Sequence, residues 1–225
     1  MYKKNIPQKN HYAIPVSTQE IAHLITEFIE GYEELSQAKP YVSIFGASKC
    51  HPNHKYYKLA HKIGLQLSNA GFSVVTGGGS GIMAAANKGA YHGNSLSVGL
   101  TVASPKETPH TKHHDITLNF SHTFTRKVML IKDATSCVVL PGGFGTLDEL
   151  AEILALAQVD KSKKIPILLV NKAFWTPLIL WFQNNLLAEN MITKKDLNLF
   201  SIVETPEEVT KRIVEYYKKH KELDH

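Results

Sequence analysis

The sequence lacks the features that mark membrane, secreted and disulfide-rich proteins. It has no apolar run of about 18 or more residues, the length that a membrane-spanning helix needs. Its first residues, MYKKNIPQKNHYAIP, lack the apolar core of a signal peptide. Only two cysteines, Cys50 and Cys137, occur in 225 residues, too few for a disulfide framework. We therefore expect a cytoplasmic protein.

Arginine is also scarce. The chain has only Arg126 and Arg212 and otherwise uses lysine, which suggests that the arginines serve geometry rather than bulk charge. The formal net charge of +5 could indicate nucleic-acid binding. The lysines are scattered, however, and their densest group, at 211–221, follows a helical pattern typical of a solvated face. A basic pocket for an anionic small molecule fits the charge equally well, so we expect no nucleic-acid partner.

What the chain does contain is a regular alternation of strand and helix patterns. Strands are predicted at 41–45, 72–75, 95–102, 136–140, 165–170 and 199–203. Helices are predicted between them, and the last helix begins at Pro206 after the N-cap Thr205. The polar, histidine-containing segment 103–120 is predicted to be a loop. The alternation predicts an α/β fold, a Rossmann-like doubly wound sheet, mostly parallel, with helices on both faces.

The first 40 residues are expected to stand apart from this pattern. Residues 1–16 are polar and aperiodic, and an amphipathic helix follows to about residue 36. This helix is expected to pack on the domain or on a partner subunit. We divide the chain into an N-terminal arm and helix, 1–40, and a single nucleotide-binding catalytic domain, 41–225. The apolar stripe expected to pack comprises Ile21, Leu24, Ile25, Phe28 and Ile29.

The most informative stretch is SCVVLPGGFGTLDELAE, residues 136–152. An apolar strand breaks at a glycine-rich turn, 141–145, which lets the backbone come close to a ligand. Thr146 stands where a helix N-cap is expected, and Glu149 follows as in a capping box. A strand, a glycine turn and a helix N-terminus together form an anion site. The plain alternative is an ordinary turn in which Glu149 only caps the helix.

All the glycine-rich turns follow strands, so Gly46, Gly77–Gly81 and Gly142–Gly145 should share one face of the sheet. Two familiar nucleotide motifs are absent. The second turn is not GxGxxG, and no GK[ST] follows either glycine loop. A monophosphate site remains, with Glu149 as the acid and Arg126 as a cation that can grip a phosphate or carboxylate with two parallel hydrogen bonds. We expect neither a cofactor nor a metal ion.

Three motifs resemble the LOG ("lonely guy") family of cytokinin riboside 5′-monophosphate phosphoribohydrolases, often mislabelled lysine decarboxylases. The family's PGGxGTxxE is intact at 141–149, and its RKxxM element is present in relaxed form at 126–129. The run TGGGSGIMAAANKGA at 76–90 resembles GGGPGIMEAANRGA of the bacterial subgroup. The resemblance covers roughly residues 41–210. It implies hydrolysis of the N-glycosidic bond of a nucleoside 5′-monophosphate by a homodimer.

By position, Arg126 and Glu149 match the family's catalytic pair. The carboxylate would stabilise an oxocarbenium-like ribosyl cation and orient a water, as in glycoside hydrolysis. The family's substrate and phosphate contacts match Glu107, Lys127, Gly142, Gly143, Gly145 and Thr146. The other two glycine turns add Gly46, Ser48, Gly77, Gly78, Gly79, Gly81 and Met83 as candidate binding residues.

Three residues depart from the family pattern and leave the preferred base open. Ala84 replaces a Glu, Lys49 replaces an Arg of the first loop, and Ala155 replaces a Thr that often lines the pocket. AMP or another purine nucleotide is as good a candidate as a cytokinin nucleotide.

Three other interpretations compete with this one. A carrier that binds nucleotides without turnover is the main alternative, because related folds often do no chemistry. A lysine decarboxylase would need a Schiff-base lysine, and no lysine stands in such a context. A metal site is disfavoured because the histidines lack a ligand motif and suit a solvated loop. They are His110, His113, His114 and His122.

Overall fold

A computed structural model describes residues 18–102, 111–159 and 165–221. Its seven strands form one sheet in the order β4-β3-β2-β1-β5-β6-β7. Every neighbouring pair is parallel, which confirms the doubly wound α/β fold. The strands are β1 Tyr41–Phe45, β2 Ser73–Thr76, β3 Ser97–Val102, β4 Ile116–Phe120, β5 Ser136–Val139, β6 Ile167–Val170 and β7 Ser201–Val203.

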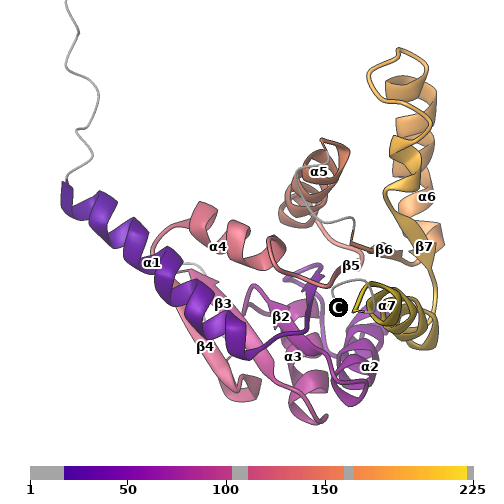
Figure 1. The fold of residues 1–225 in the computed structure, drawn as a ribbon. Helices are drawn as coiled ribbons and strands as arrows, with labels where there is room; N and C mark the ends of the chain where they lie inside the picture. The colour runs from indigo at the N-terminus through magenta and orange to yellow at the C-terminus, as the bar shows by residue number, and fades with distance from the viewer. Residues whose placement is uncertain (1–17, 103–110, 160–164, 222–225) are drawn as a thin grey trace, which may run out of the picture.

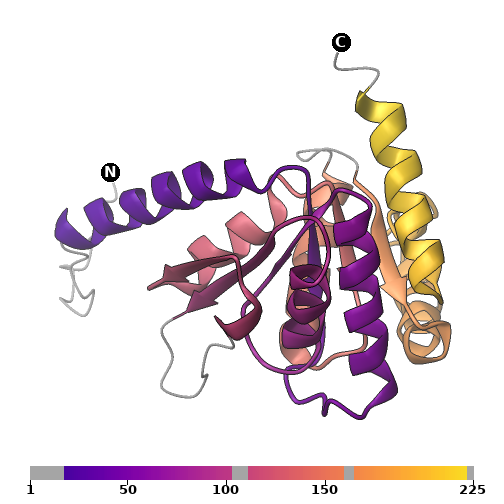
Figure 2. The same ribbon diagram turned by 90° about the horizontal axis from the view of Figure 1, so that it is seen from below.

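Helices cover both faces of the sheet (Figures 1 and 2). The helices α2, α3 and α7 pack on one face, and α1, α4, α5 and α6 pack on the other. No helix in the described ranges has the length and apolar character needed to cross a membrane. The helices are α1 Thr18–Gln37, α2 Lys55–Asn69, α3 Ile82–Tyr91, α4 Thr123–Ile131, α5 Phe144–Gln158, α6 Lys172–Trp181, continued by a π-helical turn Phe182–Leu187, and α7 Pro206–Lys221.

Strand β1 shows how the two cores are built. Successive side chains of a strand point to opposite faces of the sheet. Tyr41 and Phe45 accordingly join the core beneath α1, α4 and α5, whereas Val42 and Ile44 join the core beneath α2 and α3. All four side chains are buried, as expected of a central parallel strand.

The order of the strands places the switch point of the sheet between β1 and β5. The chain runs outward from β1 through β2 and β3 to β4, then returns to lay β5 along the free side of β1. The turns after β1 and β5 are joined by a hydrogen bond from the Ala47 N–H to the Pro141 carbonyl, 3.1 Å long. Ligands of open parallel sheets bind at this position.

The segment predicted as a loop at 103–120 contains a strand that the sequence analysis missed. β4 pairs with β3 at the edge of the sheet, and only Phe120 of its residues is buried. An edge strand needs no continuous apolar run, so Ile116-Thr117-Leu118-Asn119 gave a weak signal. Residues 103–110, which include Glu107, lie outside the described residues.

Helix α1 packs on α4, as expected of a helix docked on the domain, but only part of the predicted stripe is covered: Phe28 packs against the core, whereas the isoleucines are exposed. The exposed fractions of Ile21, Ile25 and Ile29 are 49%, 55% and 53%. The most deeply buried residues of α1 lie on the neighbouring face, where the small Gly31 allows close approach. A Cβ atom at Gly31 would lie 3.1 Å from Met129 Sδ. The buried residues of α1 are Glu27, Gly31 and Leu35.

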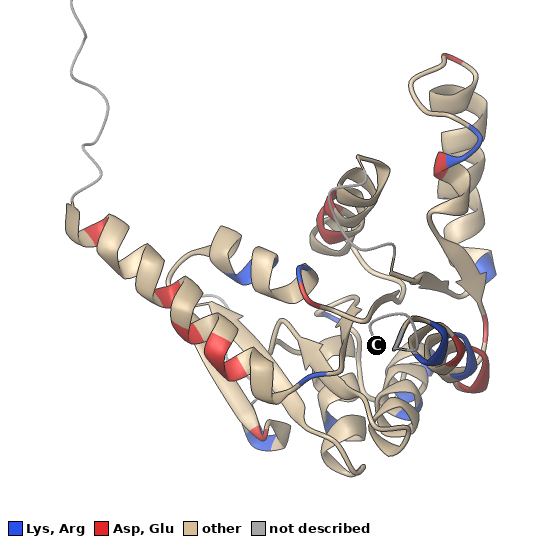
Figure 3. Cartoon of the chain, viewed as in Figure 1, with Lys and Arg blue, Asp and Glu red and all other residues tan. Residues whose placement is uncertain are grey.

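The basic C-terminal helix carries charges of both signs. Figure 3 shows acidic and basic residues together on α7, and acidic residues along α1. On α7, Arg212 lies 2.9 Å from Glu208, and Lys211 lies 3.9 Å from Glu215, each one helical turn apart. Thr205 caps the helix as predicted, because its hydroxyl accepts the Glu208 N–H at 3.2 Å.

Candidate active site

A cavity of about 540 Å³ opens at the carboxyl ends of β1, β2 and β5. The structure brings most of the predicted site residues together around it. These are Gly46, Ser48, Gly77, Met83, Arg126, Gly143, Gly145, Thr146 and Glu149. Lining residues that the sequence analysis did not name as site residues include Thr123, Leu130, Phe144 and Asp148, while Gly78, Gly79, Gly81, Lys127 and Gly142 lie outside the lining.

The glycine turn after β5 leads directly into α5, which corrects the predicted cap. Gly143, not Thr146, is the N-cap, and the helix begins at Phe144. The Gly143 carbonyl accepts the N–H groups of Thr146 and Leu147, both at 3.0 Å. The Thr146–Glu149 capping box is therefore wrong, because both residues already lie inside the helix. The N–H groups of Phe144 and Gly145, the first two residues of the helix, have no intrahelical acceptor, and both residues line the cavity.

The glycines of this turn differ in what surrounds them. A Cβ atom at Gly142 would lie 2.0 Å from Thr146 Oγ1, so this glycine is needed for the turn itself. A Cβ atom at Gly143 or Gly145 would meet nothing within 4 Å. The absence of side chains at these two positions therefore leaves open space at the helix N-terminus, where a ligand can approach the backbone.

Hydrogen bonds from buried residues fix the glycine loop after β2. The Thr76 hydroxyl hydrogen-bonds to Asn87 and accepts the Gly78 N–H at 3.0 Å. Gly81 has φ +64°, and a Cβ there would lie 2.3 Å from the Ala47 carbonyl oxygen. The loop thus packs against the turn after β1, and within it only Gly77 lines the cavity.

Arg126 reaches the cavity from the first half of α4. Thr123 and Leu130, three residues before it and four after, line the same cavity because they share its face of the helix. The Arg126 guanidinium lies over Gly77, where a Cβ would be 3.6 Å from Nη1. Arg126 Nε is buried and has no hydrogen-bond partner among the described residues.

Glu149 faces the cavity from α5 and is only 8% exposed. Its Oε2 atom is also buried without a hydrogen-bond partner in the described part of the chain. Burial raises the pKa of the carboxyl group to about 7; nearby Lys127 and Arg126 lower it, and Glu152 and Asp148 add to the rise. Burial therefore holds the pKa of Glu149 well above the ordinary value of a glutamate.

Lys127 lies beside Glu149 but outside the cavity lining. Its Nζ atom is 2.7 Å from Asp148 Oδ2 and 2.8 Å from Glu152 Oε2, so it ties α4 to α5. Burial lowers the pKa of Lys127, but these two carboxylates more than offset that effect and raise it above its ordinary value. Lys127 therefore remains charged and contributes a positive charge next to Glu149.

The three residues that depart from the family pattern lie in different surroundings. Lys49 is exposed and lines the cavity. Ala84 is half-buried on α3 outside the lining, and Ala155 is exposed on α5, at a separate hollow of about 230 Å³. Among the described residues, Lys49 is thus the one departure in the cavity wall.

No group of three or more His, Cys, Asp or Glu residues in the described ranges could hold a metal ion. His113 packs against the rings of Tyr91 and His92. His122 instead precedes α4 and lies 3.4 Å from Glu27. His110 lies outside the described residues.

Spacing in the sequence could have indicated the cavity-lining residues that the sequence analysis missed. Thr123 and Leu130 stand at helical spacing from Arg126, so the face of a predicted helix would have included them. Asp148 occupies a variable position of the PGGxGTxxE motif, and Phe144 occupies another. Phe144 is 91% exposed at the entrance of α5.

The parallel sheet, with a helix N-terminus, a buried acid and an arginine lining a cavity at its switch point, defines a Rossmann-like α/β protein. A family model described as "Possible lysine decarboxylase" matches residues 83–213 of the chain. The chain belongs to this family, and its curated relatives are those of the LOG family that its motifs resemble.

Three curated relatives illustrate the similarity. A probable cytokinin riboside 5′-monophosphate phosphoribohydrolase of Oryza sativa subsp. japonica is 27% identical over 81% of this chain and 75% of its own. A cytokinin riboside 5′-monophosphate phosphoribohydrolase of Arabidopsis thaliana is 24% identical over 81% of this chain and 86% of its own. One of Rhodococcoides fascians is 26% identical over 66% of this chain and 78% of its own.

Solved structures share the fold at lower identity. The molybdenum cofactor carrier protein of Chlamydomonas reinhardtii matches with a TM-score of 0.58 and 16% identity, over 80% of this chain and 99% of its own. A molybdenum cofactor binding protein from Rippkaea orientalis matches with a TM-score of 0.57 and 22% identity, over 78% and 98%. At these identities the likeness concerns the fold alone.

Proposed function

We propose that this protein hydrolyses the N-glycosidic bond of a nucleoside 5′-monophosphate to free base and ribose 5-phosphate. The substrate is AMP or a cytokinin-type adenosine monophosphate. The observation that carries the proposal is the pair of buried polar atoms without partners, Arg126 Nε and Glu149 Oε2, in one cavity. Buried polar groups in native proteins have partners, so a bound ligand is the natural one here. The names of the curated relatives support the same reaction.

The geometry of the cavity suits a phosphorylated ligand. The N-terminus of α5 offers backbone N–H groups and the positive end of a helix dipole, with open space at Gly143 and Gly145. Arg126 can add a bidentate contact to a phosphate. A volume of about 540 Å³ lies within the usual range for small-molecule sites, roughly 300–1,000 Å³.

The chemistry assigns Glu149 a role in its ionised form. The bond between C1′ of the ribose and the base nitrogen breaks, and its electron pair leaves with the base, which takes up a proton. The ribosyl group left behind carries positive charge, which a carboxylate in a water-poor site stabilises strongly. Glu149 also orients the water that adds to C1′ and loses its proton, as carboxylates do in glycoside hydrolysis.

The descriptive name of the family suggests a different reaction, which the site does not favour. A decarboxylase that uses pyridoxal phosphate forms a Schiff base with a lysine amine. Lys127, whose positive charge acts on Glu149, is kept protonated by Asp148 and Glu152. A protonated amine cannot act as the nucleophile for that bond.

The experiment is a turnover assay over a panel of nucleotides: AMP, the other nucleoside monophosphates and isopentenyladenosine monophosphate. Free base and ribose 5-phosphate are separated by chromatography. The expected result is release of base by the wild-type protein, at a rate that ranks the substrates, and loss of release in Arg126→Ala and Glu149→Ala. Binding detected by calorimetry without release from any nucleotide would instead favour a carrier of the same fold.

We also propose that the protein is cytoplasmic and, as the resemblance implies, a homodimer. Large apolar side chains remain exposed on the single chain, among them Ile25 on α1 and Leu180 and Trp181 on α6. Burying them against a second copy would remove apolar surface from water. Light scattering coupled to size-exclusion chromatography tests this, with a mass of about twice 25.1 kDa expected and a monomer mass contradicting it.

A further inference from the structure

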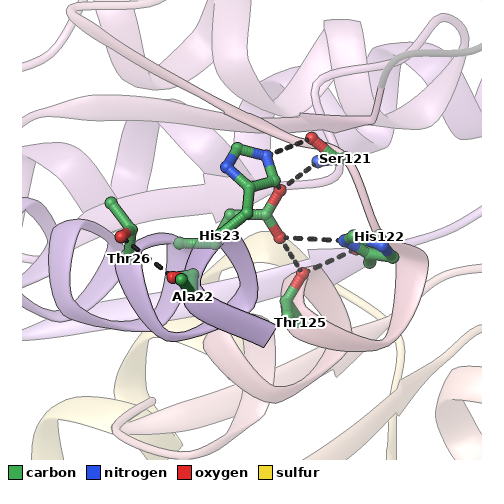
Figure 4. Close-up of polar contacts among 7 residues, drawn as sticks. Ala22, His23, Thr26, Ser121, His122 and Thr125 are labelled. Carbon is green, nitrogen blue, oxygen red and sulfur yellow. Dashed lines mark hydrogen bonds and ion pairs between the residues drawn. The ribbon is translucent and has the colours of Figure 1, made fainter. Parts of the chain in front are cut away.

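A carboxylate from α1 is buried at the start of the helix that carries Arg126. Glu27 is only 5% exposed, although it belongs to a helix whose other acidic residues lie nearer the surface. Its Oε1 accepts the backbone N–H of Ser121 at 2.6 Å, and its Oε2 accepts the Thr125 hydroxyl at 2.9 Å (Figure 4). The residues that Glu27 binds therefore bracket the first turn of α4.

Two histidines complete this contact. His122 Nδ1 lies 3.4 Å from Glu27 Oε2, and His23 Nε2 lies 3.4 Å from Oε1. His23 Nε2 also lies 2.9 Å from the Ser121 hydroxyl (Figure 4). Burial raises the pKa of Glu27, but the hydrogen bonds from Ser121, Thr125 and His122 more than offset this and lower it below its ordinary value. Glu27 is therefore ionised at neutral pH, and each of its carboxylate oxygens accepts a hydrogen bond.

Helix α4 has no side-chain cap of its own. Its N-cap residue, His122, makes no capping hydrogen bond. Instead the Glu27 carboxylate of α1 lies at this end of α4, where it accepts the Ser121 N–H just before the helix and the Thr125 hydroxyl within it. A negative charge at a helix N-terminus is stabilising. With nine residues α4 is short, so anchoring one end fixes much of it.

The same contact determines the direction of Arg126. Thr125 and Met129 face α1, whereas Arg126 and Leu130 line the cavity. Adjacent residues of a helix point about 100° apart, because a turn holds 3.6 residues. A small rotation of α4 would therefore carry the guanidinium of Arg126 away from its place over Gly77.

Contacts further along α1 hold the rest of α4. Gly31 packs closely against Met129, and the Lys132 ammonium lies 4.8 Å from the centre of the Tyr32 ring. Lys39, just after α1, lies 2.9 Å from Asp133. These contacts fix the middle and the C-terminal end of α4, and the buried carboxylate of Glu27 fixes its N-terminal end.

We propose that Glu27 is a positioning residue for the active site. By binding Ser121 and Thr125, it fixes the rotation of α4 and so aims Arg126 into the cavity. This inference rests on the proposed function, since it assigns Glu27 to the same nucleotide site. The matched family model begins at residue 83, so α1 would supply to the site a contact from outside the matched segment.

The test compares Glu27→Ala and Glu27→Gln with Glu30→Gln, a control on the exposed side of the same helix. Affinity for AMP is measured by calorimetry, and kcat and KM by base release, at a temperature where thermal melting shows each protein folded. Misplacing a catalytic group by about 1 Å costs up to about a hundredfold in rate. We expect Glu27→Ala to lower kcat/KM at least about tenfold, Glu27→Gln to lower it less, and Glu30→Gln to leave it unchanged.

A double-mutant cycle separates positioning from a purely structural role. If Glu27 acts through Arg126, then Glu27→Ala weakens AMP binding in the wild-type background but has little further effect in Arg126→Ala. An equal loss in both backgrounds, or wild-type kcat/KM in a folded Glu27→Ala, would overturn the proposal. If Glu27→Ala does not fold, wild-type kcat/KM in Glu27→Gln overturns it. A wild-type protein that neither binds nor cleaves any nucleotide refutes the proposed function, and this inference with it.

Discussion

Arg126 Nε and Glu149 Oε2 are both buried in the lining of one cavity, and neither has a hydrogen-bond partner among the described residues. The two side chains come from different helices, α4 and α5, which the Lys127–Asp148 ion pair connects at 2.7 Å. Buried polar groups in native proteins normally have partners, so this pair of atoms is the reason that we propose a ligand site here.

The first prediction concerns the pH dependence of the reaction. The profile of kcat/KM against pH reports groups of the free enzyme. The carboxyl group of Glu149 has a pKa of about 7 and must be ionised to stabilise the ribosyl cation. We therefore expect kcat/KM for AMP to rise with pH through about 7 and then to level off. A profile that falls over this range would assign Glu149 the role of a proton donor instead.

Two variants move this profile in opposite directions if the assignment is right. Lys127 lowers the pKa of Glu149 and Asp148 raises it. We expect Lys127→Met to shift the rising limb to higher pH and Asp148→Asn to shift it to lower pH. Base release by each variant is compared with that of the wild-type protein at the same series of pH values. The phosphate of the nucleotide, with a pKa near about 6, then contributes equally to every profile.

The second prediction concerns stability. The pKa of Glu149 is raised on folding from 4.5 to about 7, so the native state binds more protons than the unfolded state between these values. Stability therefore falls as pH rises through this window, by roughly 3 kcal/mol. Glu149→Gln removes the ionisation, so we expect it to raise the free energy of unfolding by about that amount at pH 8 and to change it little at pH 4. Urea unfolding at the two pH values measures this; an equal effect at both would contradict it.

A substantial part of this site could be predicted from the sequence because its signals are local. The glycine turn, Arg126 and Glu149 lie within short motifs, and the strands around them are apolar runs. The predicted start of α5 is wrong because the N-cap is Gly143, which has no side chain to make a capping hydrogen bond. In the sequence this glycine cannot be distinguished from the other glycines of the turn. Strand β4 was missed because its residues are only partly buried.

The role of Glu27 could not be predicted in this way. Its partners Ser121 and Thr125 lie 94 and 98 residues away in the chain, and nothing in a local pattern connects them. The apolar stripe of α1 indicated the buried face only in part, since Phe28 packs against the core but three isoleucines remain half exposed and a glycine lies against α4. Only the tertiary arrangement shows which side of such a helix is buried.

The third prediction distinguishes Gly145, which we expect to leave space for the ligand, from Gly142, which the turn itself requires. A methyl group at Gly145 meets nothing within 4 Å in the protein, so Gly145→Ala should fold with unchanged or slightly higher stability. It should nevertheless weaken AMP binding at least about tenfold, because the methyl group occupies space that the phosphate uses. Calorimetry and thermal melting give the two readouts.

Gly142→Ala is the matched control for this prediction. There the added Cβ would lie 2.0 Å from Thr146 Oγ1, so the loss should appear in stability, by about 1–3 kcal/mol. Unchanged AMP affinity in a folded Gly145→Ala protein would mean that the phosphate does not lie at the N-terminus of α5.

The most direct test of the proposed reaction is the turnover of AMP by the wild-type protein and by Glu149→Gln, at pH 8 and the same protein concentration. Adenine and ribose 5-phosphate are both quantified. Our account predicts that the wild-type protein releases the two products in equal amounts and that Glu149→Gln, although stably folded and able to bind AMP, releases neither at a comparable rate. Equal rates for the two proteins, or adenine without ribose 5-phosphate, would contradict it.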